Sequence, residues 1–422
     1  MARTKKLLAV ILFGALVLRI LAGAWWQSRL PAERRFAFAD SESYWTLAQT
    51  IVKGEPFQLG DTRVFRTPGY PAVLAATFWV AGSDDPPVMW ARATGALLGT
   101  LSVAGVWGLG RMLFDNTTGT LAAGMAAVFP EAIAPSVFVL SEAPFCPLMV
   151  AHLFCWTAAW RSEGRRVAWL WAGLGGLAAG GATLMRPSWL LFTPLVIGAA
   201  VVFSSQRWRH AQIGGAMLLG LALAMSPWWV RNYQVTGHFV LTTLQVGASL
   251  YDGLNPNANG GSDMRFVEEF MNEQRDFDEA HPDELTGSFE ERLDRRLGDA
   301  SLAWARQHPG RVAELAGIKF FRIWNVWPND SDLRSVWLRL VIAVGYVPLL
   351  VGGLWGAWRW GRRDWPFLLC ILPAVYFTAL HVVFVSSIRY RQPALLPMIV
   401  LAAGVVMQWH SRRSDDERSN IS

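Results

Sequence analysis

Long apolar runs recur along the chain, and a membrane-spanning helix needs about 20 such residues. The pattern predicts ten spans, near residues 7–26, 88–110, 117–136, 141–160, 167–185, 188–204, 211–230, 336–357, 365–385 and 393–409. A further apolar segment, Gly69–Gly82, is short for a span and follows two prolines, so we expect a shallow or re-entrant element there. The first run follows three basic residues and lacks a clean cleavage site, which favours a retained helix over a cleaved signal peptide.

Basic residues are concentrated in alternate connections between these spans. With a cytoplasmic N-terminus, the following fall inside: Arg111, Arg161, Arg165, Arg166, Arg207, Arg209, Arg359, Arg362, Arg363, Arg412 and Arg413. Cytoplasmic connections carry an excess of Lys and Arg, so we predict that both termini are cytoplasmic. The prediction requires that Gly69–Gly82 does not cross, because a crossing there would reverse every later connection.

Two long segments then fall on the outer, periplasmic side and divide the chain. We expect a first membrane module at 1–230 with an outer loop at 27–87, and a second outer loop at 231–335. C-terminal spans at 336–410 and a cytoplasmic tail at 411–422 complete the chain. Residues 309–327 are amphipathic, as is typical of a helix lying on the bilayer surface.

Composition narrows the class of protein. Hydrophobic residues make up 53% and charged residues 17%, whereas soluble domains carry roughly 25% charged residues. A soluble or disordered chain is therefore excluded. The net charge of +6 includes no basic domain, which argues against nucleic acid. Cys146, Cys155 and Cys370 lie in apolar runs and have neither disulfide-framework nor zinc spacing. The chain also has no nucleotide-binding glycine loop. We predict an all-α polytopic membrane protein.

The first candidate for chemistry is the segment DSESY, just outside the first span. A carboxylate there suits general-base work, and Asp40 shares a helix face with Tyr44, one turn later. The helix would end at Lys53–Gly54. Alternatively, Asp40 or Ser41 only caps that helix. Glu42 points to another face, so it does not form a matched pair with Asp40.

Two further acids and one histidine fall near or within the spans. Glu142 stands at the outer start of a span without a basic neighbour in sequence, and an ionisable group at that depth is a functional hypothesis, although it could also be an anchor. Glu131 is a weaker candidate. His381 stands alone inside a span, where hydrogen-bonded structure is the more common role. No cluster has metal-ligand spacing, and a divalent cation near Asp40 is left open.

Several arginines fall on the outer side, where the charge bias disfavours them. The phosphate-binding candidates are Arg66, Arg92, Arg186, Arg231 and Arg389, with Tyr390 beside the last. Each arginine alone could be a snorkelling anchor. Together they favour a phosphodiester ligand, because guanidinium groups bind phosphate bidentately and keep their charge. The prolines of RTPGYP make a rigid turn that would fix Arg66.

The ordered set of motifs resembles a known superfamily. The pieces are DSESYWTLAQTIVKGEPF at 40–57, RTPGYP at 66–71, SE at 141–142, LMRPSW at 184–189, SPWWVRNYQVTG at 226–237 and RYRQPALLP at 389–397. In this order they resemble the GT-C polytopic glycosyltransferases. They are most similar to the family-39-type enzymes, which are related to protein O-mannosyltransferases and the lipid A aminoarabinose transferase.

The resemblance implies a bundle of about 10–13 transmembrane helices with juxtamembrane helices in the first outer loop. It also implies a polyprenyl-phosphate-sugar donor, an acceptor that is protein, lipid or glycan, and an active site on the outer face of the inner membrane. The catalytic acid of such enzymes corresponds to Asp40. Many relatives have two adjacent acids, whereas Ser41 separates Asp40 from Glu42 here. On this hypothesis Asp40 is the base, Glu142 positions substrate, and the arginines stabilise the leaving phosphate.

Two other classes of protein compete with a transferase. A flippase or transporter of lipid-linked sugars would favour internal repeats and charges near mid-membrane, but no repeat is visible, and ionisable groups within the spans, such as Arg19 and His381, are few. A non-catalytic scaffold would have no need of Asp40.

Overall fold

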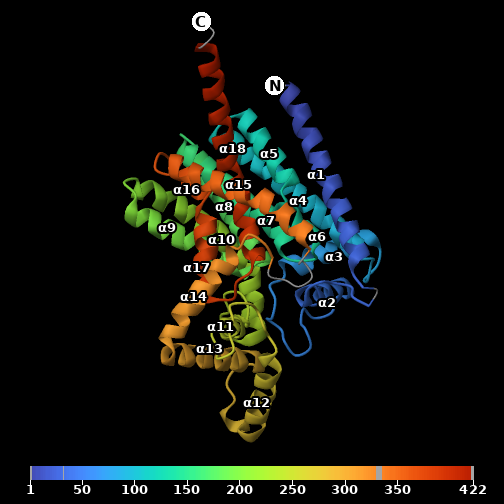
Figure 1. The fold of residues 1–422 in the computed structure, drawn as a ribbon. Coiled ribbons are helices and arrows are strands. Elements are labelled where there is room, and N and C mark those ends of the chain that lie inside the picture. Colours follow the sequence, from blue (N-terminus) through green and yellow to red (C-terminus); the bar gives the residue numbers. More distant parts are fainter. Residues whose placement is uncertain (1, 32, 329–334, 420–422) are drawn as a thin grey trace.

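The computed structural model describes residues 2–31, 33–328 and 335–419, and every named element in these ranges is a helix (Figure 1). The longer helices are α1 (Ala2–Arg29), α4 (Met89–Leu113), α7 (Glu142–Arg161), α8 (Arg165–Met185), α10 (Arg207–Thr236), α15 (Val336–Trp360) and α18 (Ile388–Ser419). The shorter ones are α2 (Ala39–Lys53), α3 (Gly69–Ala81), α5 (Asn116–Val128), α6 (Pro130–Val137), η1 (Pro187–Trp189), α9 (Phe192–Phe203), α11 (Val246–Gly253), α12 (Phe266–Ala280), η2 (Pro282–Glu284), α13 (Phe289–Gln307), α14 (Pro309–Ile323), α16 (Trp365–Leu369) and α17 (Leu372–Val383). The predicted all-α class is confirmed.

The helices account for most of the predicted spans. Within the described residues, the seven longer helices, and α16 and α17 taken together, are long and apolar enough to cross a membrane, which makes eight. The pair α5 and α6, bent by 55° where Pro130 starts α6, would make a ninth. The exception is the span predicted at 188–204. Pro187 starts a 3-10 turn there, and the 12 residues of α9 rise only about 18 Å, less than the roughly 30 Å of a bilayer core.

The basic connections gather at one end of the molecule. Arg161 donates to the carbonyl of Met112 and pairs with Asp364 at 3.4 Å, and Arg209 donates to the carbonyl of Ser162 at 3.2 Å. The N- and C-termini lie toward this end in Figure 1, whereas α12 and α13 lie at the other. The sequence grouping of basic connections on one side is therefore matched in space.

Both ends of helix α3 lie close to other segments of the chain. At its start, Gly69 lies so close to α8 that a Cβ would be 2.6 Å from the carbonyl oxygen of Leu184. Just beyond its end, Asp84 pairs with Lys53 at 3.3 Å and Asp85 pairs with Arg35 at 2.6 Å. With 13 residues, α3 is short for a membrane span, as the sequence indicates.

The amphipathic segment at 309–327 forms α14, but its apolar stripe does not all face lipid. Leu315 and Ile323 are buried within the protein, and Lys319 between them is buried too. Phe320 and Phe321 face outward. One face of α14 therefore packs on α17, and a helix packed on another helix shows the same spacing as one packed on a bilayer.

Candidate functional site

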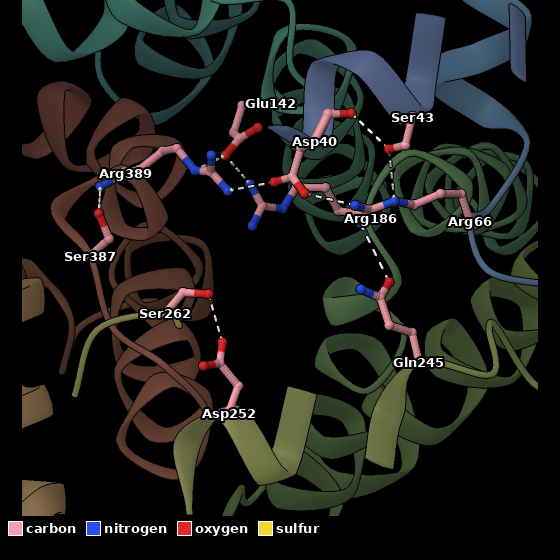
Figure 2. Close-up of polar contacts among 10 residues, drawn as sticks. All are labelled: Asp40, Ser43, Arg66, Glu142, Arg186, Gln245, Asp252, Ser262, Ser387 and Arg389. Atoms are coloured by element: carbon pink, nitrogen blue, oxygen red, sulfur yellow. Dashed lines mark hydrogen bonds and ion pairs between the residues drawn. The ribbon is translucent and has the colours of Figure 1, made fainter. Parts of the chain in front are cut away.

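A cavity of about 960 Å³ opens among α2, α7, α11, α13, α17 and α18. It brings together seven of the residues that the sequence singles out as site candidates: Asp40, Tyr44, Arg66, Glu142, Arg186, Arg389 and Tyr390. Figure 2 shows five of these side chains along one side of it, with Asp252 and Ser262 on another. Segments separated by most of the chain therefore share one concave site, the usual location of a ligand.

Asp40 lies in the first turn of α2 and does not cap it. The cap position is Phe38, which makes no side-chain capping bond. The Asp40 carboxylate instead accepts from Nη2 of Arg66 at 2.7 Å and from Nη2 of Arg389 at 3.3 Å. Arg66 is held in turn by Ser43 at 3.2 Å and Gln245 at 3.4 Å. The capping alternative is excluded, and the carboxylate faces the cavity.

Glu142 is the second acid of the site and is almost wholly buried. Its Oε1 lies 2.5 Å from Nη1 of Arg186 and 3.0 Å from Nε of Arg389. Glu142 is the first residue of α7 and Arg389 lies in the first turn of α18, so the starts of these two helices meet at the cavity. Arg389 therefore bridges both acids (Figure 2).

The five side chains alternate in charge in the order Arg66, Asp40, Arg389, Glu142, Arg186. Three guanidiniums and two carboxylates leave one net positive charge. Burial raises the pKa of Asp40, but the Arg66 and Arg389 guanidiniums outweigh burial and bring that pKa below its usual value. In Arg66, burial favours the neutral form, yet the nearby Tyr44 and Asp40 raise the pKa overall. Both shifts favour the charged forms of Asp40 and Arg66, and with three guanidiniums to two carboxylates the cluster presents a cationic face to an anionic ligand.

Aromatic rings continue the wall beside the arginines. Tyr390 stacks face to face on His381, with ring centroids 4.1 Å apart and an interplanar angle of 4°. The guanidinium carbons of Arg186 and Arg389 lie 5.5 and 5.2 Å from the Tyr390 ring centroid. Such cation–π contacts orient a guanidinium without neutralising it. The tyrosine thus helps to hold both arginines.

Sequence reasoning missed the residues on the far wall. Asp252 accepts from the Ser262 hydroxyl at 2.6 Å and from the backbone N–H of Asp263 at 2.7 Å. Gln245 reaches Arg66 from the same segment. Nearby, Lys319 donates to the carbonyls of Gly253 and Val383 at 2.9 and 2.7 Å and ties α11 to α17. The available signal was a few polar residues inside an otherwise apolar stretch at 240–254.

Three of the sequence candidates do not reach the cavity. Glu42 is exposed on another face of α2. Arg92 is buried, but it donates to the Gln27 side chain at 2.9 Å and to a backbone carbonyl. Arg231 donates to the carbonyls of Arg63 and Phe57 at 2.7 and 2.8 Å. Both arginines donate to backbone carbonyls of neighbouring segments and so hold loops in place. None of the three residues lines the cavity.

Glu131 belongs to a separate buried pair. Arg391, two residues after Arg389, points into the core and binds both oxygens of Glu131, at 2.6 and 3.1 Å. The Arg391 guanidinium also lies over the Tyr346 ring at 3.7 Å. Residues two apart on a helix face different directions, so one motif supplies both a cavity arginine and a core arginine. Among the described residues, no group of three or more His, Cys, Asp or Glu side chains could hold a metal ion.

Comparison with known proteins finds one family model that matches part of the chain. Residues 66–230 match the family model of dolichyl-phosphate-mannose-protein mannosyltransferases. This segment contains Arg66, Glu142 and Arg186, and the match confirms the resemblance that the motifs indicate. No curated protein matches the chain.

The fold is similar to that of solved membrane glycosyltransferases. An oligosaccharyltransferase of Archaeoglobus fulgidus in its apo form superposes with a TM-score of 0.62 at 15% identity, over 98% of this chain and 52% of that one. The complex of the archaeal oligosaccharyltransferase AglB from the same organism with an inhibitory peptide and a dolichol-phosphate gives 0.55 at 14%, over 96% and 52%. ArnT of Cupriavidus metallidurans bound to undecaprenyl phosphate gives 0.46 at 16%, over 93% and 77%.

At these identities the oligosaccharyltransferase structures show a shared fold and nothing about individual residues. The chain spans about half the length of those two structures. Nearly all of this chain superposes on that half.

Proposed function

We propose that this multi-pass membrane chain, whose residues 66–230 match the dolichyl-phosphate-mannose-protein mannosyltransferase family, transfers a sugar from a polyprenyl-phosphate donor to an acceptor. The observation that carries the proposal is the alternating line of three arginines and two acids on one wall of a large cavity. The family resemblance alone suggests the class of reaction. The row of three arginines and two acids supplies side chains that could perform it.

The charge and the lining of the cavity suit a lipid-linked phosphodiester. A phosphodiester carries one negative charge, which would match the net positive charge of the five side chains. Arginine forks bind phosphate oxygens bidentately. Apolar residues continue along the cavity, among them Leu190, Leu191 and Phe384. An isoprenoid chain would bury its surface there, at roughly 25 cal/mol per Å².

The chemistry needs a base on one side of the anomeric carbon and a stabilised anion on the other. The acceptor oxygen forms a bond to the anomeric carbon as the bond from that carbon to the phosphate oxygen breaks. The phosphate leaves with the electron pair, and the acceptor proton passes to the Asp40 carboxylate. Proton removal by such a base contributes typically about 10²–10⁴-fold. Arg66, Arg186 and Arg389 stabilise the charge that grows on the phosphate.

Donor binding would also change Asp40. In the structure, Arg66 and Arg389 hold its pKa down, and a carboxylate held so is a weak base. A bound phosphate competes for the same guanidiniums. When Arg66 and Arg389 bind the phosphate, they stabilise the Asp40 carboxylate less. Burial then raises the pKa of Asp40. Base strength is thus coupled to the presence of donor. Glu142 keeps Arg186 and Arg389 in place throughout.

We place the cavity on the periplasmic side, with both termini in the cytoplasm. The basic connections gather at the end of the molecule away from the cavity, and such residues favour the cytoplasmic side. The loops at 27–87 and 231–335 then form the outer part, and the sugar and acceptor would meet outside the membrane.

Transfer from a labelled polyprenyl-phosphate sugar in sealed vesicles tests the proposal. We expect Asp40→Asn to lose about 10²-fold or more of the transfer rate, because the amide keeps the shape and removes the proton acceptor. Glu42→Gln is the matched control, since Glu42 lies on the same helix turn outside the cavity. Equal thermal unfolding of both variants would show that folding is unaffected.

Wild-type turnover by Asp40→Asn would remove this residue from the mechanism. A labelled lipid that changes leaflet without delivering its sugar to an acceptor would instead identify a transporter.

A further inference from the structure

One wall of the cavity carries polar atoms that the proposed mechanism does not use. His381 is 7% exposed and lines the cavity. Its Nδ1 lies 2.8 Å from the carbonyl oxygen of Val385, and within the described chain its Nε2 has no hydrogen-bond partner. Ser188 also lines the cavity, and its buried Oγ is likewise without a partner among the described residues. A buried polar atom without a hydrogen bond is unfavourable, so both atoms are expected to bond to a ligand group.

The hydrogen bond at Nδ1 decides what that partner must be. A carbonyl oxygen only accepts, so the Val385 contact assigns the proton of a neutral ring to Nδ1. Nε2 then carries the lone pair and can only accept. A phosphate oxygen has no proton to give, and an isoprenoid chain has neither donor nor acceptor. A hydroxyl group satisfies Nε2, and the Ser188 hydroxyl can bond the same kind of ligand group as donor or acceptor.

The position of His381 relative to the arginines identifies which part of a donor would reach it. Its ring is stacked 4.1 Å from Tyr390, and Tyr390 is in turn flanked by Arg186 and Arg389. A group bonded directly to a phosphate held by these arginines falls next to this wall. In a lipid-linked sugar only two groups are bonded to the phosphate, namely the sugar and the first isoprene unit. Of the two, only the sugar has hydroxyl groups.

The acceptor is a less suitable partner for geometric reasons. It attacks the anomeric carbon in line with the breaking bond, from the face of the sugar opposite the phosphate. It therefore approaches from the side of Asp40 and not through the arginines. Arg389 pairs with Asp40 and with the buried acid Glu142. With the acceptor on the Asp40 side of the sugar, the wall that holds His381 is left to contact the sugar itself.

We propose that His381, supported by Ser188, accepts a hydrogen bond from a hydroxyl of the donor sugar and is a specificity-determining residue for it. The inference rests on the proposed function and extends it from the class of donor to the part of the site that recognises the sugar. It assigns the phosphate to the arginines and the sugar hydroxyl to a neutral wall one aromatic ring away.

The test compares two lipids on the full-length protein. One is synthetic undecaprenyl phosphate, which has no sugar, and the other is the sugar-linked lipid that co-purifies with the wild type, identified by mass spectrometry. His381→Phe keeps a ring to stack on Tyr390 and removes Nε2. We expect it to bind undecaprenyl phosphate within about twofold of wild type and the sugar-linked lipid about tenfold more weakly, as for loss of one hydrogen bond of about 1.4 kcal/mol.

A second variant guards against a general packing defect. His381→Gln has a side-chain oxygen that can accept a hydrogen bond, so we expect it to recover part of the affinity for the sugar-linked lipid. Equal weakening of both lipids in His381→Phe, or no weakening of either, would overturn the inference while leaving the proposed function standing. If the wild type binds undecaprenyl phosphate no better than Arg389→Gln does, the proposed function fails, and this inference fails with it.

Discussion

Arg389 contacts both acids of the cavity, and its role shows how far single residues could be predicted. Its position on the disfavoured side of the membrane marked it as a phosphate candidate, and the same reasoning marked Arg66 and Arg186. Their pairing could not be predicted, because Arg389 and Asp40 are 349 residues apart in sequence. The same signal also selected Arg92 and Arg231, which bind backbone carbonyls instead. The sequence shows that an arginine is charged, but it does not show which hydrogen-bond acceptors the fold places beside that arginine.

The electrostatics of Asp40 predict a pH effect. Arg66 and Arg389 lower its pKa against the effect of burial. In Arg66→Gln one of these charges is absent, so the Asp40 pKa should rise. Because the base must be ionised, the acid limb of the transfer rate should then move to higher pH. The measurement is the pH profile of kcat/KM for the donor, which reports ionisations of the donor-free enzyme.

Arg63→Gln is the control for that profile, since Arg63 is an exposed residue of the same loop that does not line the cavity. Its acid limb should coincide with that of the wild type. An Arg66→Gln profile that stays in place, or moves to lower pH, would show that Arg66 does not control the ionisation of the base.

At the scale of helices, the hydrophobic pattern predicted well which helices are present and roughly where each begins and ends. The short element at 69–82 and the helix ending at Lys53–Gly54 are present, with Gly54 in the left-handed conformation that ends a helix. The pattern failed where a proline intervened. Pro130 bends α5 against α6, and Pro187 begins the 3-10 turn that shortens α9. Apolar content alone does not reveal such a break, because it measures burial rather than backbone geometry.

The contact of α8 with α10 is another feature that pattern does not reveal. A Cβ at Gly176 would overlap the backbone carbonyl of Met217, which can move only with α10. We therefore expect Gly176→Ala to push the helices apart, to cost about 1–3 kcal/mol of stability, and to lower activity because Arg186 follows the end of α8. Thermal unfolding in detergent measures the first effect.

Gly173→Ala is the matched change on the same helix, where a Cβ meets nothing within 4 Å. Alanine favours a helix by about 1 kcal/mol relative to glycine, so this variant should be at least as stable as the wild type. Equal melting temperatures for the two variants would contradict the close approach at Gly176.

For the whole molecule, the sequence indicated which loops share a side but not the cavity that they enclose. The alternation of basic connections grouped the loops correctly, and the structure brings the basic ones together at one end. The cavity arises at the other end, where α2 of the first loop and α11 and α13 of the second meet α7, α17 and α18. That assembly depends on contacts across hundreds of residues, such as the bond from the backbone of Val64 to Glu290 at 3.1 Å, which no local pattern encodes.

The most direct measurement is an experimental structure of the protein with undecaprenyl phosphate bound. We expect the phosphate within hydrogen-bonding distance of Arg389 and of at least one of Arg66 and Arg186, the chain along the apolar wall, and Asp40 separated from one or both of its present partners. A phosphate bound away from this cavity, or bound in it with both Asp40 ion pairs intact, would contradict the central claim that these arginines hold the donor and release the base.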